Sequence, residues 1–158
     1  MSTRKILSLF VSLVLAYSTA FIGSFFTAGA IATWYATLIK PELSPPNWLF
    51  APVWTILYAC MAFAAWRIYE KRTSNRHAHF FLLVYTAHLA VNAFWSIAFF
   101  GLHSPLLALL VIAVLWVLIA YLLVQFYRMD RLAGYLFIPY LLWVSFASYL
   151  NLMIVLLN

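Results

Sequence analysis

Charged side chains divide this chain into long uncharged runs. Lys, Arg, Asp and Glu are absent from four stretches: 6–39, 43–66, 77–127 and 132–158. A bilayer core of about 30 Å is crossed by about 20 helical residues, so each stretch can supply at least one membrane-spanning helix. The third stretch is long enough for two, and glycine and proline interrupt it between Gly101 and Pro105.

The pattern predicts an all-α membrane protein, a bundle of five transmembrane helices in a single domain that covers residues 1–158. The strict alternation of apolar and polar residues that a membrane β-barrel needs is absent from the sequence. The expected spans are roughly 6–30, 47–69, 78–101, 105–127 and 132–156.

Composition excludes several other classes of protein. Apolar residues make up 68% of the 158 positions and charged residues only 8%, whereas a soluble domain carries about a quarter charged residues. Cys60 is the only cysteine, which excludes a disulfide-stapled module. The formal charge of +6 does not indicate a nucleic-acid partner, because the basic residues separate apolar runs instead of forming a stripe on a polar face. The expected surroundings are a lipid bilayer.

The first apolar run imitates a secretory signal, with Arg4 and Lys5 before it and Ala28-Gly29-Ala30 near its end. A signal's apolar region spans about 7–15 residues. This one is longer, so we expect the helix to be retained in the mature protein.

Basic residues gather on one side of the expected membrane, which favours the cytoplasmic side for those loops. Lys40 falls on the other side. The eight remaining basic residues are Arg4, Lys5, Arg67, Lys71, Arg72, Arg76, Arg128 and Arg131. We therefore expect an integral protein of a bacterial cell membrane with its N-terminus in the cytoplasm. Glu70 with Arg67 and Lys71, and Asp130 with Arg128 and Arg131, are expected to be charges at the level of the headgroups.

Small residues recur at every fourth position of the first span. They are Ser8, Ser12, Ala16, Ala20, Ser24, Ala28 and Ala32. Small side chains let helix backbones approach closely in lipid. The row predicts close packing of this span against another helix, of the same chain or of a second protomer.

Aromatic and polar residues also recur at helical spacing in three other spans. Phe50, Trp54 and Tyr58 share one face of span two, and they could form an interfacial belt or line a pocket. His88, Asn92 and Ser96 form a ladder in span three, which indicates either hydrogen bonds between helices or the polar side of a pocket. His88 could in principle ligate a haem iron, although one unpaired histidine gives little support for this. His77 and His79 flank a basic loop without a cysteine or acid of the same helix, and a metal site needs several converging ligands, so no metal site is expected.

Span five places Tyr140, Trp143, Ala147 and Asn151 near one face. A small residue beside a tryptophan makes room for a flat ligand, although Ala147 could equally allow a close helix approach.

Together these motifs resemble the translocator protein family, also called tryptophan-rich sensory proteins. The pattern W-Y-x-x-L-x-K-P-x-x-x-P-P begins at Trp34, and V-W-x-x-L-Y begins at Val53. N-x-x-W-x-x-x-F-F-G follows from Asn92, and P-Y-x-x-W-x-x-F-A from Pro139. The resemblance implies a five-helix membrane protein that forms homodimers and binds porphyrins and aromatic drugs, and in animals cholesterol.

Three positions depart from the family pattern. Leu43 stands where the family usually has tryptophan, and His88 where relatives often have glutamine. The basic residue of the animal cholesterol motif has no counterpart after Arg131, so we do not expect a cholesterol role.

The expected function is binding and sensing of porphyrins such as protoporphyrin IX or haem, with the porphyrin as ligand and no other cofactor required. Two alternatives stay open: oxidative porphyrin degradation with light and oxygen, for which Trp54 and Trp143 would be catalytic, and passive transport of tetrapyrroles or other lipophiles. Tyr35, Pro45 and Pro46 are expected to close the mouth of the site, Lys40 to bind propionates, and Trp116 to lie outside. The remaining expected ligand contacts are Phe50, Trp54, Tyr58, His88, Asn92, Trp95, Tyr140, Trp143 and Ala147.

Overall fold

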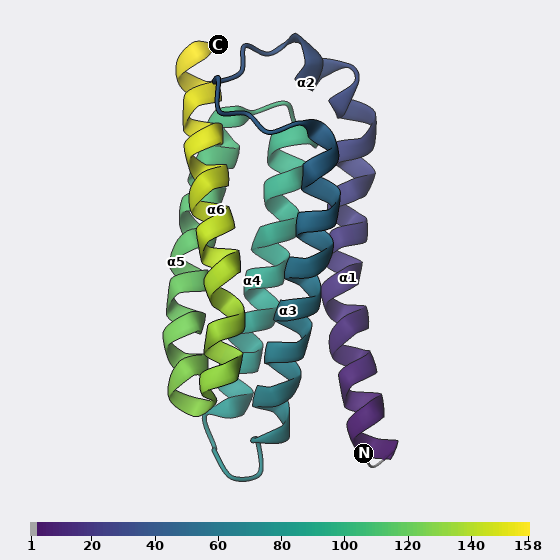
Figure 1. Cartoon of the computed structure of the whole chain (residues 1–158), viewed down its shortest axis with the longest axis vertical. Coiled ribbons are helices and arrows are strands. Elements are labelled where there is room, and N and C mark those ends of the chain that lie inside the picture. Colours follow the sequence, from purple (N-terminus) through teal and green to yellow (C-terminus); the bar gives the residue numbers. More distant parts are fainter. Residues whose placement is uncertain (1–2) are drawn as a thin grey trace.

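The computed structural model describes residues 3–158, and in this part of the chain the regular structure is entirely helical. The elements are α1 (Thr3–Ile31), α2 (Trp34–Thr37), the 3-10 helix η1 (Asn47–Leu49), α3 (Phe50–Glu70), α4 (Ala78–Ser96), the π-helical turn η2 (Ile97–Gly101), α5 (Pro105–Met129) and α6 (Arg131–Leu157). The five long helices run side by side along one elongated bundle, with the two termini at opposite ends (Figure 1). Each is long and apolar enough to cross a membrane, which confirms the predicted fold class.

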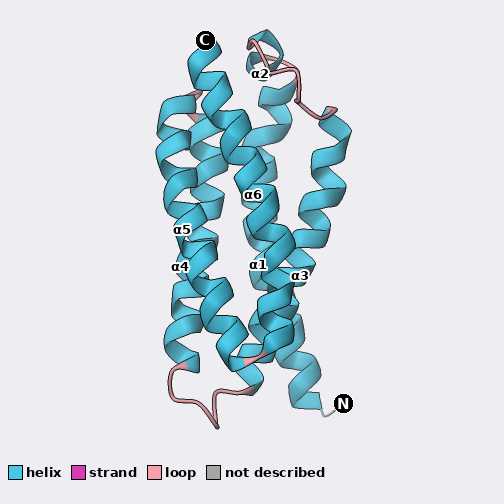
Figure 2. Ribbon diagram, turned by 60° about the vertical axis from the view of Figure 1, so that its left-hand side comes forward, coloured by secondary structure: helices cyan, strands magenta, loops and turns pink. Residues whose placement is uncertain are grey.

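The ends of the helices follow from local sequence. Ser104 caps the N-terminus of α5 by accepting a hydrogen bond from the Leu107 amide at 3.4 Å, and Pro105 occupies the first turn, where its missing N–H costs nothing. The connector after α1 contributes the short helix α2, which lies across the end of the bundle that also carries the C-terminus (Figures 1 and 2).

Asp130 joins α5 to α6 and holds both to α3. Its carboxylate accepts a hydrogen bond from the Ala133 amide at 3.0 Å and so caps α6. The Arg67 guanidinium donates to both carboxylate oxygens, at 2.9 and 2.8 Å, and the Lys71 ammonium lies 3.3 Å away. These donors lower the pKa of Asp130 to about 2, the hydrogen bonds from Arg67 contributing most. The turn thus directs the Asp130 side chain toward α3 instead of toward Arg128 and Arg131, its basic neighbours in sequence.

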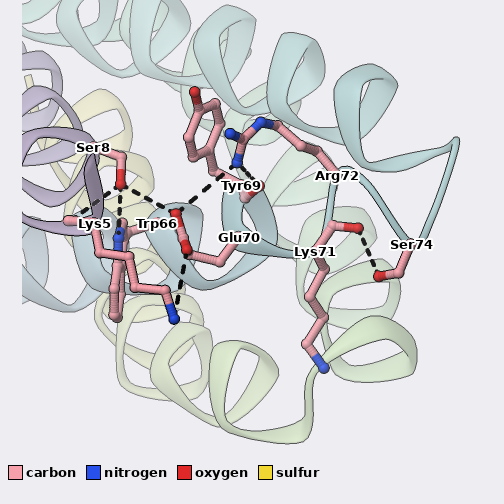
Figure 3. A network of polar contacts seen from close by, with 8 residues as sticks. All are labelled: Lys5, Ser8, Trp66, Tyr69, Glu70, Lys71, Arg72 and Ser74. Atoms are coloured by element: carbon pink, nitrogen blue, oxygen red, sulfur yellow. Dashed lines mark hydrogen bonds and ion pairs between the residues drawn. The ribbon is translucent and has the colours of Figure 1, made fainter. Parts of the chain in front are cut away.

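A polar network fastens the first turns of α1 to the end of α3 (Figure 3). The Trp66 indole N–H donates to the Ser8 hydroxyl at 3.1 Å, and that hydroxyl lies 3.2 Å from a Glu70 oxygen. Lys5 and Arg72 lie at 4.0 and 3.9 Å from the Glu70 carboxylate. Glu70 thus pairs with α1 and with Arg72, and not with Arg67, whose guanidinium is bound to Asp130.

The row of small residues in α1 has two different environments. Near the network Ala16 is fully buried, which fits close packing. Further along, Ala20, Ser24 and Ala28 border a cavity. The backbones still approach at Gly23, where a Cβ atom would lie 3.0 Å from the Ser96 hydroxyl oxygen of α4.

Candidate functional site

A cavity of about 540 Å³ lies in the half of the bundle that α2 covers. Its walls come from α1, α3, α4 and α6, together with the turns η1 and η2, and Tyr35 of α2 borders it from the covered end. Ligand sites in proteins typically enclose about 300–1,000 Å³ and are mostly apolar with a few polar groups. The cavity therefore has the size and lining of a small-molecule site.

Most of the residues expected to contact a ligand border this cavity. They are Tyr35, Phe50, Trp54, Tyr58, Asn92, Trp95, Trp143 and Ala147. Pro45, Pro46, His88 and Tyr140 are not part of the lining. The two prolines lie in the connector before η1, and the other two side chains are fully buried.

Three indoles from three helices face the cavity, each held by another aromatic ring. The Trp54 ring lies 5.6 Å from that of Tyr58, and the Trp143 ring lies edge-on to Phe50 at 5.7 Å. Trp95 stacks on Phe99 of the π-helical turn at 5.5 Å. Packing of this kind fixes the rings and leaves broad apolar surface for a flat ligand.

Two residues of the polar ladder in span three, His88 and Asn92, belong to a hydrogen-bonded chain behind the cavity, whereas the third, Ser96, borders the cavity itself. Tyr58 Oη donates to Asn92 Oδ1 at 2.6 Å, and Asn92 Nδ2 donates to Tyr140 Oη at 2.8 Å. His88 Nε2 lies 2.9 Å from Tyr140 Oη, and its Nδ1 lies 3.0 Å from the Tyr85 carbonyl oxygen. Both ring nitrogens of His88 are thus occupied by protein groups outside the cavity, so the histidine is not placed to ligate a haem iron there.

The wall formed by α1 was not predicted from the sequence. Besides the small residues, α1 contributes Tyr17, Phe21, Thr27 and Ile31. Tyr17 Oη donates to the Thr55 carbonyl oxygen at 2.9 Å and links α1 to α3 at the level of the Tyr58 ring. The row of small residues was the available signal, since small side chains also leave room.

The cavity opens between α1 and the beginning of α3. The lining residues that are exposed all come from these two sides; they are Phe21, Ser24, Ala28, Asn47, Ala51 and Thr55. Both helices are long enough to span a bilayer, so an opening between them is suited to the entry of a lipophilic molecule from the lipid.

One charged group near the cavity can hold a ligand. The Lys40 ammonium lies 4.6 Å above the Tyr35 ring, next to the covered end of the cavity. Trp116, by contrast, lies outside, where its indole N–H donates to the Ser145 hydroxyl at 2.8 Å.

Comparison with known proteins places this architecture in a family. Residues 10–157 match the model of the TspO/MBR family. The chain is 39% identical over 155 residues to the tryptophan-rich protein TspO of Chlorobaculum tepidum, with 98% of each chain covered. It is 42% identical to the protein of that name from Archaeoglobus fulgidus over 157 residues, covering 98% of this chain and 99% of the relative. The human translocator protein is 35% identical over 132 residues, which are 83% of this chain and 78% of the human one.

The matches extend over both the helices that carry the hydrogen-bonded chain and those that form the cavity. With five apolar helices of membrane-spanning length, this chain is an integral membrane protein that belongs to the TspO/MBR family.

Proposed function

We propose that the protein binds porphyrins, such as protoporphyrin IX or haem, in the cavity between α1, α3, α4 and α6, as a binding or sensing protein. The observation that carries the proposal is the cavity of about 540 Å³ with indoles from three helices on its walls. A porphyrin is a broad, flat aromatic ring, and its stacking on tryptophan gains about 0.5–1.5 kcal/mol per ring beyond the buried area. Ala147 supplies space beside Trp143, and the opening toward lipid suits a ligand that partitions into the bilayer.

The carboxylates of the porphyrin need a positive or polar partner. Lys40 is the basic residue next to the covered end of the cavity, held against the Tyr35 ring. A propionate that extends past Tyr35 would meet this ammonium, while the macrocycle stays among the apolar walls.

The test is a parallel titration of purified protein with protoporphyrin IX, haem and a sterol, followed by quenching of tryptophan fluorescence. We expect saturable binding of the porphyrins and none of the sterol. Saturable binding of the sterol, with none of either porphyrin, would contradict the proposal.

Porphyrin degradation is the second candidate, favoured by the position of Trp54 and Trp143 on the wall of the same cavity. Indoles can be oxidised, so a porphyrin excited by light beside them has electron donors within reach. Illumination of the bound complex in air separates the two functions. Loss of porphyrin absorbance in the wild type, slowed in Trp54→Phe with binding intact, would establish turnover.

We also propose that the protein is a homodimer of a bacterial cell membrane, with its N-terminus in the cytoplasm. The basic residues support the orientation. The start of α1, the end of α3 and the end of α5 lie at the end of the bundle opposite α2 (Figure 1), and these segments or the residues next to them include Lys5, Arg67, Arg72 and Arg128. The family resemblance supports the dimer, which chemical crosslinking in native membranes tests.

For the orientation, a cysteine introduced by Asn75→Cys in a Cys60→Ser background should react with an impermeant thiol reagent only after the cells are opened. Labelling in intact cells would reverse the orientation.

A further inference from the structure

In the hydrogen-bonded chain behind the cavity, only one assignment of donors and acceptors is possible. The Tyr85 carbonyl oxygen can only accept, so His88 Nδ1, 3.0 Å away, must carry a hydrogen. Neither hydrogen-bond partner of His88 is charged, and the ring is fully buried. A buried imidazolium without a countercharge is costly, so the ring is neutral and its Nε2 carries a lone pair.

This lone pair fixes the remaining bonds one after another. Nε2 takes the single hydroxyl hydrogen of Tyr140 at 2.9 Å. The Tyr140 oxygen then accepts from Asn92 Nδ2 at 2.8 Å. The amide is thereby oriented with Oδ1 toward Tyr58, which donates to it at 2.6 Å. The Tyr58 hydrogen therefore points into the protein.

Tyr58 consequently presents only lone pairs to the cavity, which both Tyr58 and Asn92 border. Four other hydroxyls of the walls behave in the same way, because they donate to main-chain carbonyl oxygens. They are Tyr17, Ser24, Thr27 and Thr55. At the Tyr58 hydroxyl, the wall of the cavity therefore offers a hydrogen-bond acceptor and no donor.

We propose that His88 is a positioning residue that holds the Tyr58 hydroxyl as an acceptor, so that the cavity beside Tyr58 prefers ligands with an N–H or O–H group over ligands of similar shape that carry only an acceptor. This inference rests on the proposed function, since it requires an aromatic ligand in the cavity. His88 acts without touching the ligand, through Tyr140, Asn92 and Tyr58. A site that hydrogen-bonds a ligand group discriminates strongly against analogues that leave its own polar atoms unpaired.

Glutamine in place of His88 would no longer fix which groups of the chain donate and which accept. Its amide can donate to Tyr140 Oη as well as accept from it. Tyr140 is then free to donate to Asn92 Oδ1, and the turned Asn92 amide to donate to Tyr58 Oη. The Tyr58 hydrogen becomes available to a ligand, and the preference for donors is lost.

The experiment uses two flat three-ring probes with opposite polarity. Carbazole carries one N–H donor, and acridine carries one ring-nitrogen acceptor and no donor. Each is titrated into the purified full chain in detergent at mildly alkaline pH, where acridine is neutral. The measured quantity is the ratio of the two dissociation constants in each variant, because partition of the probes into detergent cancels when variants are compared.

We expect His88→Gln to reduce the preference for carbazole about fivefold, the typical effect of one hydrogen bond. Tyr58→Phe removes the acceptor directly and should weaken carbazole by a similar factor without weakening acridine. It also keeps the inference testable if His88→Gln does not fold. His79→Gln is the matched control, since it makes the same substitution at an exposed position of α4 and should leave the ratio unchanged.

If His88 only packs against its neighbours, both dissociation constants will change by the same factor and the ratio will stay constant, which overturns the inference. Failure of the proposed function looks different: binding of both probes would then be indifferent to Trp54→Ala. Binding can also be sensitive to Trp54→Ala while the ratio of the two dissociation constants is the same in wild type, His88→Gln and Tyr58→Phe. That result contradicts only the role of His88 and leaves the proposed function standing.

Discussion

Asp130→Asn removes one charge from the turn between α5 and α6 while it keeps an oxygen that can cap α6. The change therefore isolates the pairing with Arg67 and Lys71. Folding lowers the pKa of this carboxyl from an ordinary value of about 3.9 to about 2. A difference of about two pKa units corresponds to about 2.5 kcal/mol of stabilisation. The Arg67 and Lys71 side chains are 33% and 43% exposed, so water screens part of this, and we expect a loss of about 1.5–2.5 kcal/mol.

Thermal unfolding in detergent measures the effect, with an expected decrease in Tm on the order of 3–8 °C near neutral pH. The sign of the pH dependence follows from the lowered pKa. The stabilisation is fully present above about pH 4, and it disappears as pH falls through the folded pKa of about 2. The difference between wild type and Asp130→Asn should therefore vanish in strong acid.

Glu70→Gln is the control, because it also removes the charge of an acidic side chain at this end of the bundle. Its ion pairs are long, at 3.9 and 4.0 Å, so the expected loss stays below about 1 kcal/mol. Equal melting of Asp130→Asn and wild type at neutral pH would refute the reasoning, as would a difference that persists in strong acid.

Three further substitutions test other parts of the structure. Ala147→Leu should obstruct the cavity by bulk, so that affinity falls more for protoporphyrin IX than for carbazole in parallel titrations; an equal loss for both would argue against a steric effect. Lys40→Ala should weaken binding of protoporphyrin IX a few-fold and leave its dimethyl ester unaffected, because only the free carboxylates need the ammonium. Gly134→Ala should destabilise the α5–α6 turn by about 1–3 kcal/mol, since the added Cβ would lie 2.6 Å from the Tyr127 Cα atom; unchanged melting would show that the turn can relax.

The five long helices could be predicted because charged residues are confined to the ends of apolar runs. With η1 and η2 counted as parts of α3 and α4, the expected spans and the observed helices agree within three residues at each end, where capping groups such as Ser104 and Asp130 decide the boundary. The partner of Asp130 could not be predicted, because Arg67 lies on another helix and reaches it only once α3 packs against α6.

In the candidate site, too, features set by spacing along one helix could be predicted, whereas contacts between helices could not. The spacing of Trp54 and Tyr58 places both on one face, which the structure turns toward the cavity. Spacing alone does not reveal that His88 pairs with Tyr140 behind that face. Nor does it distinguish small residues that allow close packing from those that leave a space. Ala16 and Ala20 occupy equivalent positions in the repeat, and only the separation of α1 from α3 and α4 decides between the two.

The central claim is that a porphyrin occupies the cavity lined by Trp54 and Trp143. The most direct measurement compares protoporphyrin IX affinity in Trp54→Ala, Trp143→Ala and Trp116→Ala, each checked for normal folding by its melting curve. Loss of one stacking ring removes about 0.5–1.5 kcal/mol in addition to the lost contact area, so the first two variants should bind at least several-fold more weakly. Trp116→Ala should bind like the wild type. Weaker binding in Trp116→Ala, with wild-type affinity in the other two, would place the porphyrin elsewhere and contradict the account.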